Sequence, residues 1–175
     1  GMDTMPTHSE IREFFGDNAL VCAMSKRNGT KYYAKLLGME IKECESKFGD
    51  QLEDYCILQI QEKLGLDGEK TKPRYPYDIL VNRNVKVDVK ASRLFNNYGN
   101  AKYYTFNLEK KEQTCDIFVF YCINQNNEIE KTLVIPSTVL SGKNQLAIGK
   151  SSMYDKYIAQ WRFISDYNKF MTELQ

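Results

Sequence analysis

The sequence predicts an α/β fold in which a central mixed β-sheet is flanked by helices. Residues 85–89 alternate valine with charged side chains, as in a strand with one buried face. Residues 116–123 form a near-continuous apolar run, which is typical of a buried central strand. Residues 50–64 have the apolar periodicity of an amphipathic helix. A chain of 175 residues with this mixture fits one compact domain with a small appendage.

The appendage is expected at residues 1–43, as a helical unit ahead of a main domain at 44–175. Ser9 is a helix-capping residue type, and the break at 27–29 contains glycine, which interrupts helices. Gly38 would end the last helix as a C-cap. Short helices are therefore expected at residues 9–15, 19–25 and 30–37.

The last two of these helices, with the tight glycine-containing turn between them, resemble a helix-turn-helix. Basic side chains without an intervening acid cluster on the turn and its second helix, where contacts to DNA phosphates would form. The alternative is a helical subdomain that packs on the main domain and merely exposes its lysines. The candidate DNA-binding residues of this unit are Lys26, Arg27, Lys31 and Lys35.

The next element is the helix expected at residues 50–64. Glu53, Ile57, Ile60 and Leu64 fall on one face of it, so a glutamate heads an apolar stripe. Glu53 is a candidate site residue for this reason. The alternative is a capping box, because Asp50 and Glu53 have the spacing in which the glutamate only satisfies a backbone N–H at the helix start.

A β-hairpin follows. Residues 77–81 are strand-like, and Asn82-Arg83-Asn84 is turn chemistry, because asparagine tolerates the left-handed conformation of short hairpin loops. In the second strand, Val85, Val87 and Val89 share one face, and Asp88 and Lys90 project from the other. Two acid-base groups therefore lie on one face of the same strand.

The rest of the chain supplies further strands and a closing helix. Residues 103–108, 116–123 and 129–135 are expected strands. A long amphipathic helix is expected from Ser152, which has capping-box spacing to Asp155. The apolar face of this helix would join the core and consists of Tyr154, Tyr157, Ile158, Trp161 and Ile164.

The hairpin turn determines which acids meet. If the loop centres on Arg83, Asp78 lies directly opposite Asp88. Opposed residues of an antiparallel pair have Cβ atoms roughly 4.5 to 5.5 Å apart and point to one face. Two carboxylates at that distance repel unless a proton or a cation lies between them, and hard oxygen ligands suit Mg²⁺ or Mn²⁺. The hairpin therefore predicts a metal site with a lysine beside it.

Asp78, nine intervening residues and then Asp88-Val89-Lys90 resemble the signature of the PD-(D/E)xK nuclease superfamily, the restriction-endonuclease-like fold. The proline of that signature is displaced here, because Tyr77 separates Pro76 from Asp78. The resemblance covers roughly residues 44–135. An acid-x-lysine tripeptide alone is common in this chain and occurs also at residues 40–42, 45–47 and 109–111.

The resemblance implies a role for each residue. Asp78, Asp88 and the carbonyl of Val89 would hold Mg²⁺ or Mn²⁺. Lys90 would orient the attacking water or stabilise the transition state. Glu53 would correspond to the glutamate of the helix before the hairpin, and would complete the outer shell of the metal or bind a second ion.

The charge around the hairpin favours a phosphate-rich partner, although the net charge of the chain is only +1. Between residues 70 and 93 the only two acids are Asp78 and Asp88, and they lie among seven basic residues. The alternative is an ordinary solvated, lysine-rich surface. Lys70, Lys72 and Lys90 belong to this basic set, and its candidate DNA-binding members are Arg74, Arg83, Lys86 and Arg93.

Several other classes of site are disfavoured. The five cysteines include no CxxC pair, which argues against a zinc site, and His8 is the only histidine. No apolar run approaches the roughly 20 residues of a membrane helix. We expect a cytoplasmic protein.

These observations predict a Mg²⁺-dependent endonuclease that hydrolyses phosphodiester bonds of double-stranded DNA, with a homodimer allowed. The residues do not distinguish restriction, homing and repair roles, or DNA from RNA. One alternative is a non-catalytic DNA-binding protein that uses the helix-turn-helix on an inactive nuclease fold. Another is a protein-interaction module in which the motif is accidental.

Overall fold

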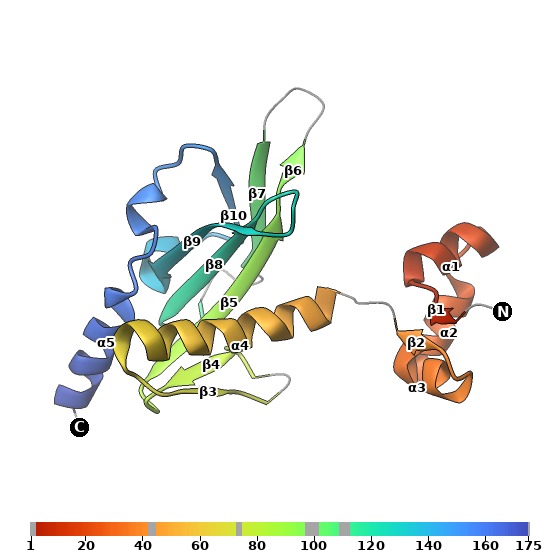
Figure 1. Ribbon diagram of the computed structural model, residues 1–175, viewed down its shortest axis with the longest axis horizontal. Coiled ribbons are helices and arrows are strands. Elements are labelled where there is room, and N and C mark those ends of the chain that lie inside the picture. Colours follow the sequence, from red (N-terminus) through yellow and green to blue (C-terminus); the bar gives the residue numbers. More distant parts are fainter. Residues whose placement is uncertain (1–2, 42–44, 73–74, 97–101, 109–112, 175) are drawn as a thin grey trace. The chain divides into compact units, whose positions relative to one another are not determined.

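A computed structural model describes residues 3–41, 45–72, 75–96, 102–108 and 113–174. The chain forms two compact units, Gly1–Phe48 and Gly49–Gln175, which we call the N-terminal and C-terminal units (Figure 1). Helix α4, Glu45–Leu64, contains the boundary between them.

The N-terminal unit consists of three short helices and a two-stranded parallel sheet. Its helices are α1 (His8–Phe15), α2 (Ala19–Arg27) and α3 (Gly29–Leu36). Strand β1, Thr4–Met5, pairs with β2, Glu40–Ile41, which brings the two ends of the unit together. A small core holds the helices on this sheet and consists of Met5, Ile11, Val21, Met24 and Ala34.

Two details of this unit differ from the sequence prediction. Thr7, and not Ser9, caps α1, because its side chain accepts from the Glu10 backbone N–H and Glu10 reaches back to the Thr7 N–H at 2.7 Å. Only Asn28 separates α2 from α3, which is shorter than the three or four residues of a usual helix-turn-helix turn. The helix-turn-helix interpretation therefore stays a prediction.

The C-terminal unit is built on a mixed sheet, as the sequence predicts. Among the described residues this sheet has five strands, in the order β3-β4-β5-β8-β9. Strands β5 and β8 are parallel, and the other neighbours are antiparallel. The strands are Gly68–Lys70, Ile79–Val81, Val85–Arg93, Ile117–Ile123 and Ile129–Pro136.

Strand β8 is the centre of the core, because all seven of its residues are buried. At the strand period of two, Phe118, Phe120 and Cys122 share one face. They pack with residues of a second sheet, β10-β7-β6, such as Phe106 and Leu146. The strands of this second sheet are Phe95–Asn96, Lys102–Asn107 and Gln145–Gly149.

Helix α4 covers the opposite face of the five-stranded sheet (Figure 1). The rings of Tyr55 in α4 and Tyr121 in β8 lie 5.9 Å apart. A Cβ atom at Gly68 would lie 3.3 Å from the side chains of both Ile57 and Ile79, so glycine lets β3 approach the helix. The helix is therefore anchored beside the hairpin that carries the acids.

The start of α4 is a correction to the sequence prediction. The helix begins at Glu45 and not at residue 50, so Asp50 and Glu53 are interior residues. A capping box requires its acidic residue in the first turn, and the alternative explanation of Glu53 is therefore wrong.

The C-terminal segment differs most from the prediction. Helix α5 spans Arg162–Glu173, whereas a helix was expected from Ser152. The Ser152 N–H donates to the Asp155 carboxylate and the Tyr154 N–H donates to the Ser152 hydroxyl, but only one 3₁₀ turn follows, Asp155–Tyr157. Ala159 then takes a left-handed φ of 51°, which stops a right-handed helix. Ile158 forms an isolated bridge to Leu133, so this segment serves as an irregular edge of the sheet.

Smaller differences concern strand length. Strand β4 begins at Ile79, whereas residues 77–81 were expected to be extended in a strand. Strands β3, β6 and β10 were not expected, because they are short and lack a long alternating pattern. Between β9 and β10 lies a 3₁₀ helix, Ser137–Leu140. None of the described helices has the length and apolar character that crossing a membrane requires.

Candidate active site

The β4–β5 hairpin sets the position of the two aspartates. Ile79 pairs with Val87 and Val81 with Val85, so Asp78 directly precedes the paired residues of β4 and Asp88 directly follows Val87 on β5. The turn is tight because Asn82 and Arg83 both take left-handed φ values, 46° and 59°. The loop thus centres on Arg83.

Asp78 lies just before β4, where the regular ladder has ended. Its backbone N–H donates to the Val87 carbonyl at 3.0 Å. Its carboxylate Oδ2 accepts the Val89 N–H at 2.7 Å, which would otherwise bond to a strand partner. A charge-assisted bond of this kind is stronger than a neutral one. The Asp78 carboxylate is therefore fixed at the edge of β5.

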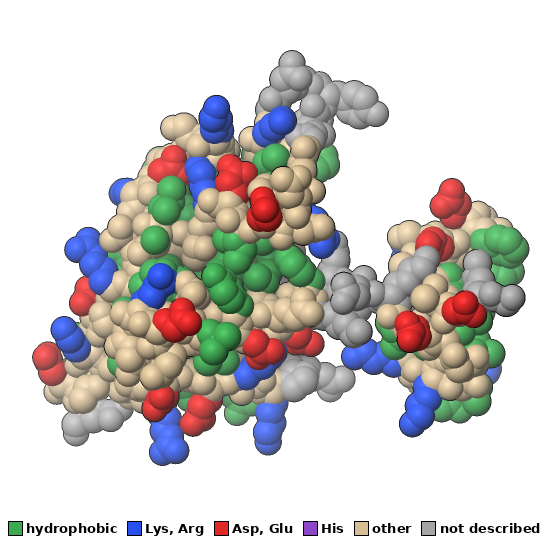
Figure 2. Space-filling view, in the orientation of Figure 1, with side chains coloured by type: hydrophobic (Ala, Val, Ile, Leu, Met, Phe, Trp, Pro, Cys, Tyr) green, Lys and Arg blue, Asp and Glu red, His purple; other side chains and the backbone are tan. Residues whose placement is uncertain are grey.

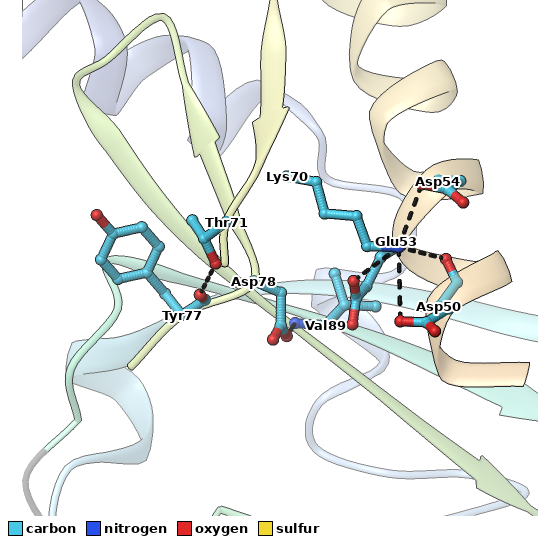
Figure 3. A network of polar contacts seen from close by, with 8 residues as sticks. All are labelled: Asp50, Glu53, Asp54, Lys70, Thr71, Tyr77, Asp78 and Val89. Carbon is cyan, nitrogen blue, oxygen red and sulfur yellow. Dashed lines mark hydrogen bonds and ion pairs between the residues drawn. The ribbon is translucent and has the colours of Figure 1, made fainter. Parts of the chain in front are cut away.

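Two threonines hold the segment that carries Asp78. The Thr71 hydroxyl donates to the Tyr77 carbonyl at 2.6 Å, and the Thr71 N–H donates to the Asp78 carbonyl at 2.8 Å (Figure 3). The Thr114 hydroxyl donates to the Pro76 carbonyl at 2.7 Å. Sequence reasoning missed both threonines, because no motif or periodicity links either of them to Asp78.

Asp88 and Lys90 lie on one face of β5, beside Phe118 and Phe120 of β8. The Lys90 Nζ is 3.0 Å from Asp88 Oδ1, and these side chains are 23% and 15% exposed. Val85 and Val87 are buried on the opposite face, as the alternation predicts. The pair is screened from water in part and remains accessible to an ion.

Val89 separates Asp88 from Lys90 and turns its backbone toward Asp78. In an antiparallel pairing, the N–H and C=O groups of one residue point to the same side of the strand. Because the Val89 N–H donates to Asp78, its carbonyl faces the same edge. The Asp78 carboxylate and the Val89 carbonyl oxygen therefore lie along the same edge of β5, just before the first residue of β4.

Glu53 projects from α4 toward this edge. Its Oε2 lies 3.1 Å from Lys70 Nζ, and its side chain is 20% exposed (Figure 3). Burial and the nearby carboxylate of Asp78 raise the pKa of Glu53, although the hydrogen bond from Lys70 opposes the shift. The structure therefore brings Glu53 into the electrostatic field of Asp78. Sequence reasoning had counted Lys70 only as one of the basic residues.

The residues at this edge fit a hard divalent cation by their chemistry. The described residues contain no group of three or more His, Cys, Asp or Glu side chains spaced to hold a metal. Mg²⁺ does not require such a group, because it commonly takes one or two carboxylates and completes its shell with water and substrate phosphate. Asp78 and Asp88 would supply two carboxylates to such an ion, and the Val89 carbonyl would supply a third oxygen.

The comparison with solved structures bears on the fold. The chain is similar to the structure of a bacterial homing endonuclease, I-Ssp6803I, with a TM-score of 0.54 and 16% sequence identity. The match covers 74% of this chain and 97% of that enzyme. Over the matched part, the chain shares the fold of that enzyme. No family model matches the sequence. The search of curated proteins found no match.

The candidate DNA-binding residues of the C-terminal unit lie in different settings. Arg83 is exposed at the hairpin tip, and Lys86 is exposed on β5 with its amine 5.9 Å from the Tyr77 ring centre. Arg93 donates to the Asn127 side chain at 3.3 Å. Arg74 lies outside the described residues. Basic and acidic side chains are interspersed over the face of this unit in Figure 2.

The candidate residues of the N-terminal unit are on two helices. Lys26 and Arg27 form the last turn of α2, and Lys31 and Lys35 belong to α3. All four side chains are exposed, so a phosphate backbone could reach them.

Proposed function

We propose that this chain is a divalent-metal-dependent DNA endonuclease whose site has the PD-(D/E)xK arrangement. The observation that carries the proposal is the hairpin edge, where the Asp78 carboxylate accepts the N–H of Val89, the residue between Asp88 and Lys90, and Lys90 is ion-paired with Asp88. The fold shared with a homing endonuclease supports it.

Asp78, Asp88 and the Val89 carbonyl would hold Mg²⁺ or Mn²⁺ at this edge. When bound, the cation would polarise the phosphoryl oxygen of DNA and lower the pKa of a coordinated water. The Asp78 carboxylate has a second oxygen besides the one that accepts from Val89, and this oxygen is available to a ligand by its chemistry.

Lys90 would act on the reacting phosphate. Its ammonium group is ion-paired with Asp88 at 3.0 Å, which would keep it close to a metal bound by that carboxylate. A preorganised positive charge there stabilises the negative charge that develops in the transition state, or orients the attacking water. Glu53 would complete the outer shell from the side of α4.

The basic side chains would bind the DNA backbone. Arg83, Lys86, Arg93 and Arg74 belong to the segment that carries the acids, and contacts from them would orient the duplex over the hairpin edge. The lysines and arginine of α2 and α3 would add phosphate contacts from the N-terminal unit.

The direct test is Asp78→Asn. The amide oxygen of asparagine can still accept the Val89 N–H, so the fold should persist, whereas a charged ligand is lost. We expect Ca²⁺ affinity, measured by calorimetry without DNA, to fall at least about 10- to 100-fold, the range known for altered metal sites. Cleavage of a randomised duplex library in Mn²⁺ should be lost with it. Unchanged Ca²⁺ affinity would count against the proposal.

A second prediction concerns the N-terminal unit. If its basic residues contact phosphates, replacing Lys26, Arg27, Lys31 and Lys35 with alanine should weaken duplex binding. The slope of log K against log salt should flatten by close to one unit per lost contact. A matched variant with alanine at four exposed lysines of the C-terminal unit controls for net charge, and its positions are Lys63, Lys150, Lys156 and Lys169. An equal salt slope in both variants would leave the N-terminal unit a structural role.

A further inference from the structure

Lys70 joins the edge strand of the sheet to the helix that carries Glu53. It is the last residue of β3, where it pairs with Ile79 at the start of β4. Its amine lies 3.1 Å from Glu53 Oε2 and 3.3 Å from Asp54 Oδ1, and it donates to the Asp50 carbonyl at 3.0 Å. Figure 3 shows these contacts converging on one ammonium group.

The arrangement is specific because the acceptors come from one turn of one helix. Glu53 and Asp54 follow Asp50 by three and four residues, so all three side chains lie on one face of α4. A lysine ammonium has three N–H donors, and the Asp50 main chain takes one of them. The others are directed at the carboxylates, which restrains Glu53 in one orientation.

The negative charges around Glu53 also favour a cation beside its carboxylate. Asp50 and Asp78 both repel a charged Glu53, whose side chain is largely screened from water. Without a nearby cation, this repulsion would turn the Glu53 side chain away from Asp78. Asp50 and Asp54 are two-thirds exposed, so water already screens them, and Glu53 depends most on Lys70.

We propose that Lys70 is a positioning residue of the active site, which acts by holding Glu53 beside Asp78. The inference rests on the proposed function, because Glu53 matters to cleavage only if the hairpin edge is the site. Within the part of the chain that the structure describes, Lys70 forms ion pairs with Asp50, Glu53 and Asp54 and with neither Asp78 nor Asp88, so we expect its effect to pass through Glu53.

A double-mutant cycle distinguishes this role from a general structural one. Lys70→Met keeps the aliphatic length and removes the charge, Lys70→Arg keeps the charge, and Glu53→Gln removes the group through which Lys70 acts. Lys63→Met is the matched control, because Lys63 is an exposed lysine in the last turn of α4. Cleavage in Mn²⁺ and calorimetric Ca²⁺ binding are measured for each variant, and melting curves report on the fold.

We expect Lys70→Met to slow cleavage about 10- to 100-fold, as misplacement of a site group does. Ca²⁺ affinity should not fall, because removing a cation makes the site more negative. In the Glu53→Gln background the same change should alter the rate by less than about twofold, since residues that act through one another are not additive. Lys70→Arg should restore most of the rate, and Lys63→Met should match the parent.

Equal slowing by Lys70→Met in both backgrounds would overturn the inference, and so would a parallel fall of Ca²⁺ affinity and rate. Failure of the proposed function has a different signature. In that case Asp88→Asn leaves Ca²⁺ binding and cleavage unchanged, and the inference about Lys70 is rejected with it.

Discussion

Lys90→Ala is expected to slow DNA cleavage by about 10² to 10³, the usual cost of losing one preorganised electrostatic contact. Cation binding should persist, because Asp78, Asp88 and the Val89 carbonyl remain. The amine of Lys90 lies 3.0 Å from Asp88 Oδ1, so its removal also takes away a positive charge that would compete with the cation for this carboxylate. The variant thus separates turnover from metal binding.

Asp88→Asn is the matched partner of that variant. It changes the other half of the same ion pair, but it removes a charged ligand, so Ca²⁺ affinity and cleavage should fall together. Both side chains project from the face of β5 opposite the buried Val85 and Val87, and both variants should fold. Calorimetry with Ca²⁺ and single-turnover cleavage in Mg²⁺ or Mn²⁺ measure the two effects. If Lys90→Ala cleaves as fast as the parent, the assigned site is wrong.

Phe120→Ala is expected to lower the free energy of unfolding by about 3 to 5 kcal/mol, the typical cost of truncating a buried phenylalanine. Phe120 is fully buried in β8. Its ring centre lies 4.8 Å from that of Phe106 and 5.4 Å from that of Phe118. The variant therefore leaves a cavity where the two sheets meet, and loses aromatic contacts as well as buried area.

Urea denaturation followed by circular dichroism measures the loss. Phe170→Ala is the control, because Phe170 is 57% exposed on α5 and its truncation should change stability by less than about 0.5 kcal/mol. A loss below about 1 kcal/mol for Phe120→Ala would contradict the placement of the core between the sheets.

The sequence predicted most where the information is local. Asn82 and Asn84 flank the turn, and the alternating valines fix which face is buried, so the hairpin register could be derived from a dozen residues. The uninterrupted apolar run of β8 identified the central strand in the same way. The assignment of Asp78, Asp88 and Lys90 to catalysis stays a prediction that the experiments above test.

The failures have a different physical origin. The aromatic residues after Ser152 have helical spacing, but Tyr154 and Trp161 reach the core from an irregular segment, because tertiary packing can bury a side chain from any backbone. Lys70 and Thr114 hold the site through contacts with residues far away in the sequence, whereas Thr71 contacts Tyr77 six residues on. No periodicity or spacing encodes such contacts.

The late start of β4 has a consequence for how the site could be redesigned or lost. At Val89 a carboxylate replaces the backbone partner that a longer strand would provide. If β4 extended past Val89, its main chain would pair with the Val89 backbone and occupy the edge at which a phosphate would have to bind. If the proposed function is correct, the catalytic centre is an interruption in the sheet. Insertions or substitutions that extend the ladder would then abolish activity without altering any catalytic group.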